Sequence, residues 1–67
     1  MKPGTIFEHK HFLDLKKMPL LCKVFDVRNG VVYWRHWGID MRNKGRFMFD
    51  LKDARKHVGQ IIDEVKS

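Results

Sequence analysis

The fold is decided by the stretch LLCKVFDVRNGVVYWRHW, residues 20–37. At its centre lies Asn29-Gly30, a pair typical of a two-residue type I′ turn, because both positions of that turn need a positive φ. The flanking segments, 20–28 and 31–37, are rich in β-branched and aromatic residues, which favour strands. The stretch therefore predicts a β-hairpin.

The turn also predicts the register of this hairpin, with Val27 facing Val32 and Phe25 facing Trp34. In residues 46–50, phenylalanines at 47 and 49 alternate with other side chains, and this pattern predicts a further short strand. One face of the sheet then carries Leu21, Phe25, Val27, Val32, Trp34, Phe47 and Phe49, and we expect it to form the core. The opposite face carries Val24, Arg28, Tyr33, Arg35, Trp37, Arg46 and Met48. Cys22 is expected to be a buried packing residue.

Residues outside the hairpin complete an α+β prediction. A strand is expected over residues 5–12, after the Pro3-Gly4 turn. Apolar residues at 51, 54, 58, 61, 62 and 65 follow a helical period, so residues 51–66 predict one amphipathic helix with Asp50 as its N-cap. We expect a single domain, 1–67, in which 1–19 form a strand and loop and 20–50 form antiparallel strands. A small sheet of three to four strands would pack on this C-terminal helix.

Charge is distributed unevenly along the chain. The 67 residues include 14 Lys and Arg against 8 Asp and Glu, which gives a net charge of +6. Residues 50–67 carry four of each sign, so the whole excess lies in residues 1–49. A concentrated basic excess favours a polyanionic partner such as nucleic acid.

Several classes of function are disfavoured by composition. The single cysteine allows no internal disulfide, and we expect a reducing, cytoplasmic location. No apolar run is long enough for a membrane span, and residues 1–10 do not resemble a signal peptide. His9 and His11 would point the same way on a strand, but solvated or rim positions are expected rather than a metal site. No catalytic constellation or phosphate loop is present, so we expect no enzyme activity and no cofactor.

The face opposite the predicted core suggests a binding surface. Arginines interleaved with Tyr33 and Trp37 can pair with phosphates and stack on bases. In the alternative, residues 1–19 fold over this face and close a small barrel, in which Trp37 and Val24 form a second core.

The segment from Gly45 to Ala54, GRFMFDLKDA, follows an Asn-Gly hairpin and resembles a known class of DNA-binding domain. These are the three-stranded-sheet-plus-helix domains of phage integrase arm-binding segments and of ethylene-response factors. The likeness is at the level of the fold, and it rests on Gly45, Phe47, Asp53 and Ala54. It implies that the exposed sheet face enters the major groove, with Arg28, Tyr33, Arg35, Trp37 and Arg46 in contact with DNA. A Src-homology-type barrel has similar hairpins, but the long predicted helix speaks against it.

Two functions remain in view. The first is a small basic DNA-binding protein of phage, plasmid or bacterial regulatory type, whose contacts with duplex DNA come from Arg28, Tyr33, Arg35, Trp37, Arg42, Lys44 and Arg46. The second is a non-catalytic protein-interaction module that uses an exposed patch of Trp37, Tyr33 and Met48.

Overall fold

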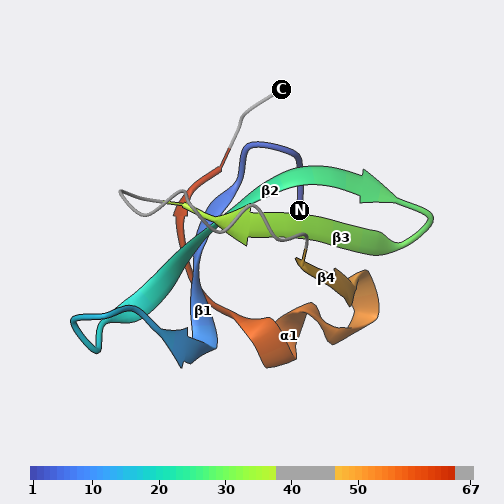
Figure 1. Cartoon of the computed structure of the whole chain (residues 1–67). Coiled ribbons are helices and arrows are strands. Elements are labelled where there is room, and N and C mark those ends of the chain that lie inside the picture. Colours follow the sequence, from blue (N-terminus) through green and yellow to red (C-terminus); the bar gives the residue numbers. More distant parts are fainter. Residues whose placement is uncertain (38–46, 65–67) are drawn as a thin grey trace.

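The computed structural model describes residues 1–37 and 47–64. Its strands are β1 (Ile6–Leu13), β2 (Pro19–Arg28), β3 (Val31–His36), β4 (Phe47–Asp50) and β5 (Val58–Asp63). Between β4 and β5 lie a 3-10 turn, η1 (Leu51–Asp53), and one helical turn, α1 (Ala54–His57). The strands form one antiparallel sheet in the order β4-β3-β2-β1-β5 (Figure 1). The α+β class, the antiparallel sheet and a C-terminal helix are confirmed, but the sheet has five strands rather than three or four.

The predicted hairpin turn is present. Asn29 and Gly30 have φ of 50° and 74°, as a type I′ turn requires. The carbonyl of Gly30 accepts a hydrogen bond from the backbone N–H of Leu51 at 2.7 Å. The turn therefore also anchors the start of η1.

The register of the hairpin is as predicted only near the turn. Asp26 faces Tyr33 and Val27 faces Val32, but the pairing then shifts by one residue, and Val24 faces Trp34. The shift is a β-bulge, in which one extra residue on β2 leaves the ladder unpaired. The predicted pairing of Phe25 with Trp34 is therefore wrong.

Because of the bulge, the residues of β2 that precede Phe25 lie on the opposite side of the sheet from the one predicted. Cys22 and Val24 are fully buried in the core, with Phe7, Val32, Trp34 and Phe49. Phe25 and Leu21 were predicted in the core, but Phe25 is half-buried and Leu21 is 37% exposed. Burial of Cys22 is confirmed, and the placement of Val24 on the outer face is wrong.

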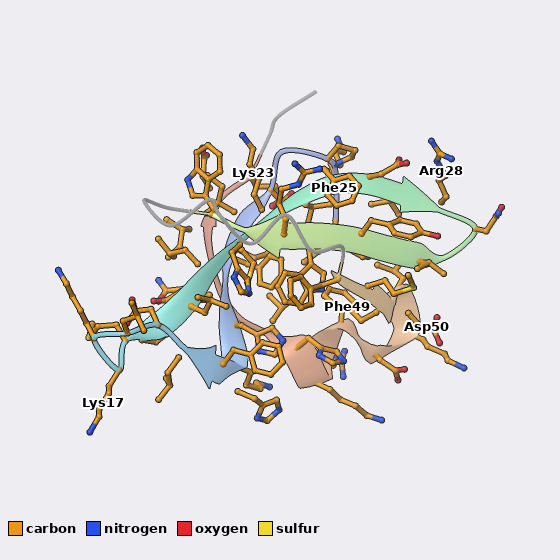
Figure 2. The ribbon with its side chains drawn as sticks, in the orientation of Figure 1. Lys17, Lys23, Phe25, Arg28, Phe49 and Asp50 are labelled. Atoms are coloured by element: carbon orange, nitrogen blue, oxygen red, sulfur yellow. The ribbon has the colours of Figure 1, made fainter. Side chains whose placement is uncertain are left out.

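The sheet curls around this core. The ring of Phe7 on β1 lies 6.2 Å from that of Phe49 on β4, although two strands separate β1 from β4 in the sheet. Figure 2 shows Phe49 on the inner side of the sheet and Lys23 and Phe25 on the other side. β1 extends the sheet beside β2 rather than folding over the outer face, so the proposed second core of Trp37 and Val24 does not form.

The long helix predicted over residues 51–66 is wrong, because helical structure ends at His57 and β5 follows. Val58, Ile61 and Ile62 are β-branched, and Gly59 is a poor helix former, so local propensity disfavours a helix here. β5 instead pairs with the free edge of β1. Asp50 precedes η1 as predicted, but its side chain makes no capping hydrogen bond.

Within the described residues, β4 and β5 are the two edge strands of the sheet, and η1 and α1 connect them. In the described ranges, no helix has the length and apolar character needed to cross a bilayer.

Candidate nucleic-acid interface

The outer face of the β2–β3 hairpin carries most of the predicted contact residues that the structure describes. Arg28, Tyr33, Arg35 and Trp37 lie on it, and Met48 of β4 is exposed beside Tyr33. Arg42, Lys44 and Arg46 lie outside the described residues. The structure adds Lys23 and Phe25 to this face, and we refer to Lys23, Phe25, Arg28, Tyr33, Arg35 and Trp37 as the outer face.

Lys23 and Arg35 form the basic centre of the outer face. They are direct partners across β2 and β3, so two positive side chains stand opposite each other on one side of the sheet. In the described part of the chain, ion pairs join Arg28 to Asp26 and Lys56 to Asp53, and neither Lys23 nor Arg35 takes part in one. Like charges placed directly opposite on neighbouring strands destabilise a sheet.

Aromatic rings hold both cations in place. The Nζ atom of Lys23 lies 4.1 Å from the centroid of the Trp37 ring, and the Cζ atom of Arg35 lies 4.5 Å from the centroid of Phe25. Such contacts attract a cation without neutralising it. The centre therefore keeps its positive charge in a defined geometry.

The N-terminal turn borders the same centre. The backbone N–H of Gly4 donates to the carbonyl of Val24 at 2.7 Å, and this bond holds residues 3–4 against β2. A hollow of about 360 Å³ lies between this turn and the basic centre, lined by Pro3, Gly4, Lys23, Val24, Phe25, Arg35 and Trp37. An anionic group entering the hollow would meet both cations.

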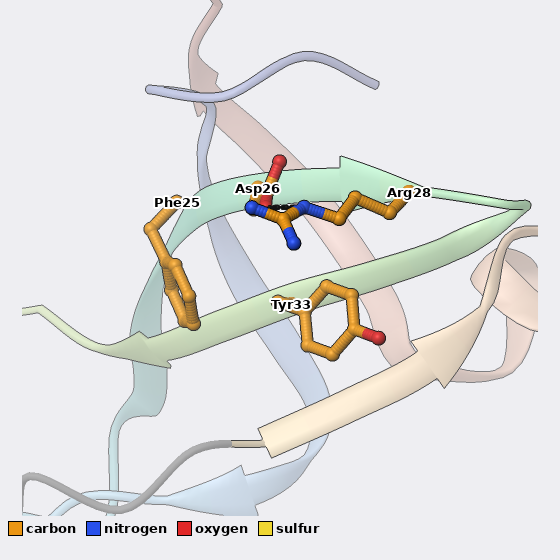
Figure 3. A pocket seen from close by; sticks show the side chains of 4 residues that line it. All are labelled: Phe25, Asp26, Arg28 and Tyr33. Carbon is orange, nitrogen blue, oxygen red and sulfur yellow. Dashed lines mark ion pairs between the residues drawn. The ribbon is translucent and has the colours of Figure 1, made fainter.

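A second hollow lies nearer the hairpin turn. It has a volume of about 390 Å³ and is lined by Phe25, Asp26, Arg28 and Tyr33 (Figure 3). The Nε atom of Arg28 lies 2.5 Å from Oδ2 of Asp26, while Oδ1 of Asp26 accepts the backbone N–H of Val27 at 2.9 Å. This arrangement orients the guanidinium of Arg28 along the strand and offsets its charge in part.

Sequence reasoning missed Lys23 because it assumed one register for the whole hairpin. Extended beyond the pair of Phe25 and Trp34, that register would place Lys23 on the core side of the sheet. A lysine there would be a buried charge with no partner, which is strongly unfavourable. Cys22 and Val24 are apolar and Lys23 is charged, and this alternation favours Lys23 on the outer side. The disagreement between this alternation and the register of the turn was the available signal for a bulge.

The histidines form a separate cluster on the inner side of the sheet. His9 is only 3% exposed, so its predicted solvated or rim position is wrong. Its Nδ1 atom accepts the backbone N–H groups of His11 and Phe12 at 3.0 and 3.2 Å, and its ring stacks on Phe12 with centroids 4.1 Å apart. Burial, with the nearby His57, His11 and His36, lowers the pKa of His9 to about 4.

Neither this cluster nor Cys22 offers an evident reactive group. Among the described residues, no set of three or more His, Cys, Asp or Glu side chains is placed to hold a metal ion. Burial raises the pKa of the Cys22 thiol to about 12, so the thiolate that would act as a nucleophile is scarcely populated. The outer face is therefore the better candidate site.

Comparison of this chain with protein-family models, curated proteins and solved structures finds no match.

Proposed function

We propose that this protein binds duplex DNA through the outer face of the β2–β3 hairpin, as a small basic regulatory protein of phage, plasmid or bacterial type. The observation that carries the proposal is the opposed pair of Lys23 and Arg35, which has no carboxylate partner in the described chain. The pair opposes folding of the sheet, whereas a phosphate placed between the two side chains would neutralise both.

The shape of the hairpin supports a duplex as the partner. The major groove of B-DNA admits a two-stranded β-ribbon. β2 and β3 are neighbouring antiparallel strands within the sheet, flanked by β1 and β4, and their contact residues lie on one side of it. In this arrangement Lys23 and Arg35 contact phosphates, and Arg28 near the turn reaches the groove floor. Tyr33 and Trp37 supply stacking or shape contacts.

Titration of a labelled duplex at about 100 mM salt, and again at several-fold higher salt, tests the proposal. We expect binding at the lower salt and a steep loss of affinity at the higher salt, because counterions are released when phosphates are neutralised. The Trp37→Ala variant should bind more weakly with a similar salt slope, since stacking releases no counterions. A folded parent protein that binds no duplex at low salt would refute the proposal.

A protein partner is the alternative use of the same face. Met48 is 61% exposed and Trp37 is 39% exposed, and such side chains are frequent at the centres of protein interfaces. Binding to a protein through this apolar contact would depend less on salt than binding to DNA.

A further inference from the structure

A second exposed surface lies at the connection between β1 and β2, away from the outer face. We call residues 13–18 the β1–β2 tip. Its three apolar side chains are exposed, and Leu15 is 96% exposed. Lys16 and Lys17 lie between Leu15 and Met18, and Figure 2 shows the Lys17 side chain pointing away from the molecule. A fully exposed leucine beside two lysines contributes nothing evident to the core.

The backbone of the β1–β2 tip is held by its own hydrogen bonds. The Oδ1 atom of Asp14 accepts the N–H groups of Lys16 and Met18 at 2.8 and 3.0 Å. The N–H of Asp14 donates to the carbonyl of Met18 at 2.8 Å, and the N–H of Lys17 donates to the carbonyl of Asp14 at 3.0 Å. The tip is therefore organised before binding, which lowers the entropy lost when a partner docks on Leu15.

The chain carries a surface of complementary chemistry on β5. Ile61 and Ile62 are 44% and 52% exposed, and the exposed acidic residues Asp63 and Glu64 follow them directly. β5 is an edge strand, hydrogen-bonded to β1 on one side only, and Val58–Asp63 contain no lysine or proline that would block pairing at an edge.

The two surfaces have opposite charge and similar apolar content. Among the described residues, Lys16, Lys17, Asp63 and Glu64 form no ion pair. Figure 1 shows the β1–β2 connection and the end of β5 in separate parts of the molecule, so they do not cover each other within one copy.

We propose that the β1–β2 tip of one copy docks on β5 of a second copy, with Leu15 against Ile61 and Ile62 and with the two lysines facing Asp63 and Glu64. A two-fold axis would form the contact twice and close the assembly as a dimer. The proposal does not depend on DNA binding.

Sedimentation equilibrium of the full chain, from micromolar to millimolar concentration, tests the dimer. We expect the mean mass to rise from 8.1 kDa towards twice that value. Leu15→Ser should raise the dissociation constant by about tenfold or more, whereas Leu51→Ser, an exposed apolar position outside both surfaces, should leave it unchanged. A protein that stays monomeric throughout the range, or a dimer that tolerates Leu15→Ser, would overturn the proposal.

Exchanging the charges tests the assigned contact. Reversal of the tip, with Lys16→Glu and Lys17→Glu together, should weaken the dimer by about tenfold. Adding Asp63→Lys and Glu64→Lys to that variant should restore much of the lost affinity, because the opposite charges face each other again. If the combined variant associates no better than the tip variant, the tip does not dock on β5. Circular dichroism of each variant verifies that it is folded.

Discussion

The inner and outer faces of the β2–β3 hairpin share one backbone but differ in what their side chains contribute. On the inner face, Val24, Val32 and Trp34 are buried against Phe7 and Phe49, and their burial favours folding. On the outer face, Lys23 and Arg35 stand opposite each other without a counter-charge in the described chain. Folding explains the first arrangement but not the second, and the proposed DNA-binding role of the outer face rests on this difference.

The largest difference between the two faces is expected for phenylalanine truncation. Phe7 is fully buried and contacts the rings of Trp34 and Phe49 edge-on, so Phe7→Ala should reduce the free energy of unfolding by about 3–5 kcal/mol. Phe25→Ala, on the outer face, removes the same side chain from a half-buried site and should have a much smaller effect. Urea denaturation of both variants measures the difference. Equal losses would mean that the bulge is misplaced and that Phe25 belongs to the core.

The inner face should also make folding sensitive to acid. The pKa of His9 is lowered from 6.5 to about 4, so between these values the unfolded chain binds a proton that the folded protein does not. Stability should therefore be full above pH 7 and should fall by about 3 kcal/mol as the pH drops to about 4.

Denaturation midpoints measured across this pH range give the test. His9→Gln should flatten the acid loss, whereas His11→Gln, at an exposed position of the same strand, should retain it. An acid loss that is identical in the His9→Gln variant would contradict the assignment.

Substitution of Gly59 should have an intermediate effect on stability, because Gly59 on β5 lies close to the backbone of β1. A Cβ atom built at this position would lie 3.2 Å from the carbonyl oxygen of Glu8, so one of the two strands must move. We expect Gly59→Ala to destabilise the fold by about 1–3 kcal/mol. In a helix the same substitution would stabilise by about 1 kcal/mol. The sign of the change in melting temperature therefore distinguishes β5 from the helix that the sequence predicted.

The smallest effect on stability is expected at the outer face, where removal of a charge should stabilise the fold rather than destabilise it. Lys23→Gln removes one of two opposed charges and should leave stability unchanged or raise it by about 0.2–1 kcal/mol. Thermal denaturation at low salt measures this change. A clear loss of stability would indicate that the contact of Lys23 with Trp37 stabilises the fold by more than the repulsion between Lys23 and Arg35 destabilises it.

These comparisons also show how far the sequence could predict the molecule. Asn29-Gly30 predicted the turn correctly because a positive φ at both positions is a local property. The bulge at Phe25 was not predicted, because no glycine or proline marks it and its only signal was the alternation of Cys22, Lys23 and Val24, which conflicts with the register of the turn. The end of the helix was misplaced because Val58, Ile61 and Ile62 fit both a helical stripe and an edge strand.

The same reasons explain the result for the candidate site. Arg28, Tyr33, Arg35 and Trp37 were placed together correctly, since alternation along β3 and the register near the turn are local. Lys23 and Phe25 were missed because they come before the bulge. The hollow beside Pro3-Gly4 depends on a contact between residues distant in sequence, which the pattern of neither segment indicates.

The central claim is that Lys23 and Arg35 bind DNA phosphates, and the salt dependence of duplex binding tests it most directly. For the Lys23→Gln, Arg35→Gln double variant we predict weaker binding at low salt and a slope of log affinity against log salt that is smaller by about two. Lys52→Gln, with Arg55→Gln, removes the same charge at exposed positions of η1 and α1 and serves as the matched control, with a slope close to that of the parent. If the parent binds duplex and the double variant keeps the parent's slope, or if the control loses as much as the double variant, the outer face is not the DNA-binding surface.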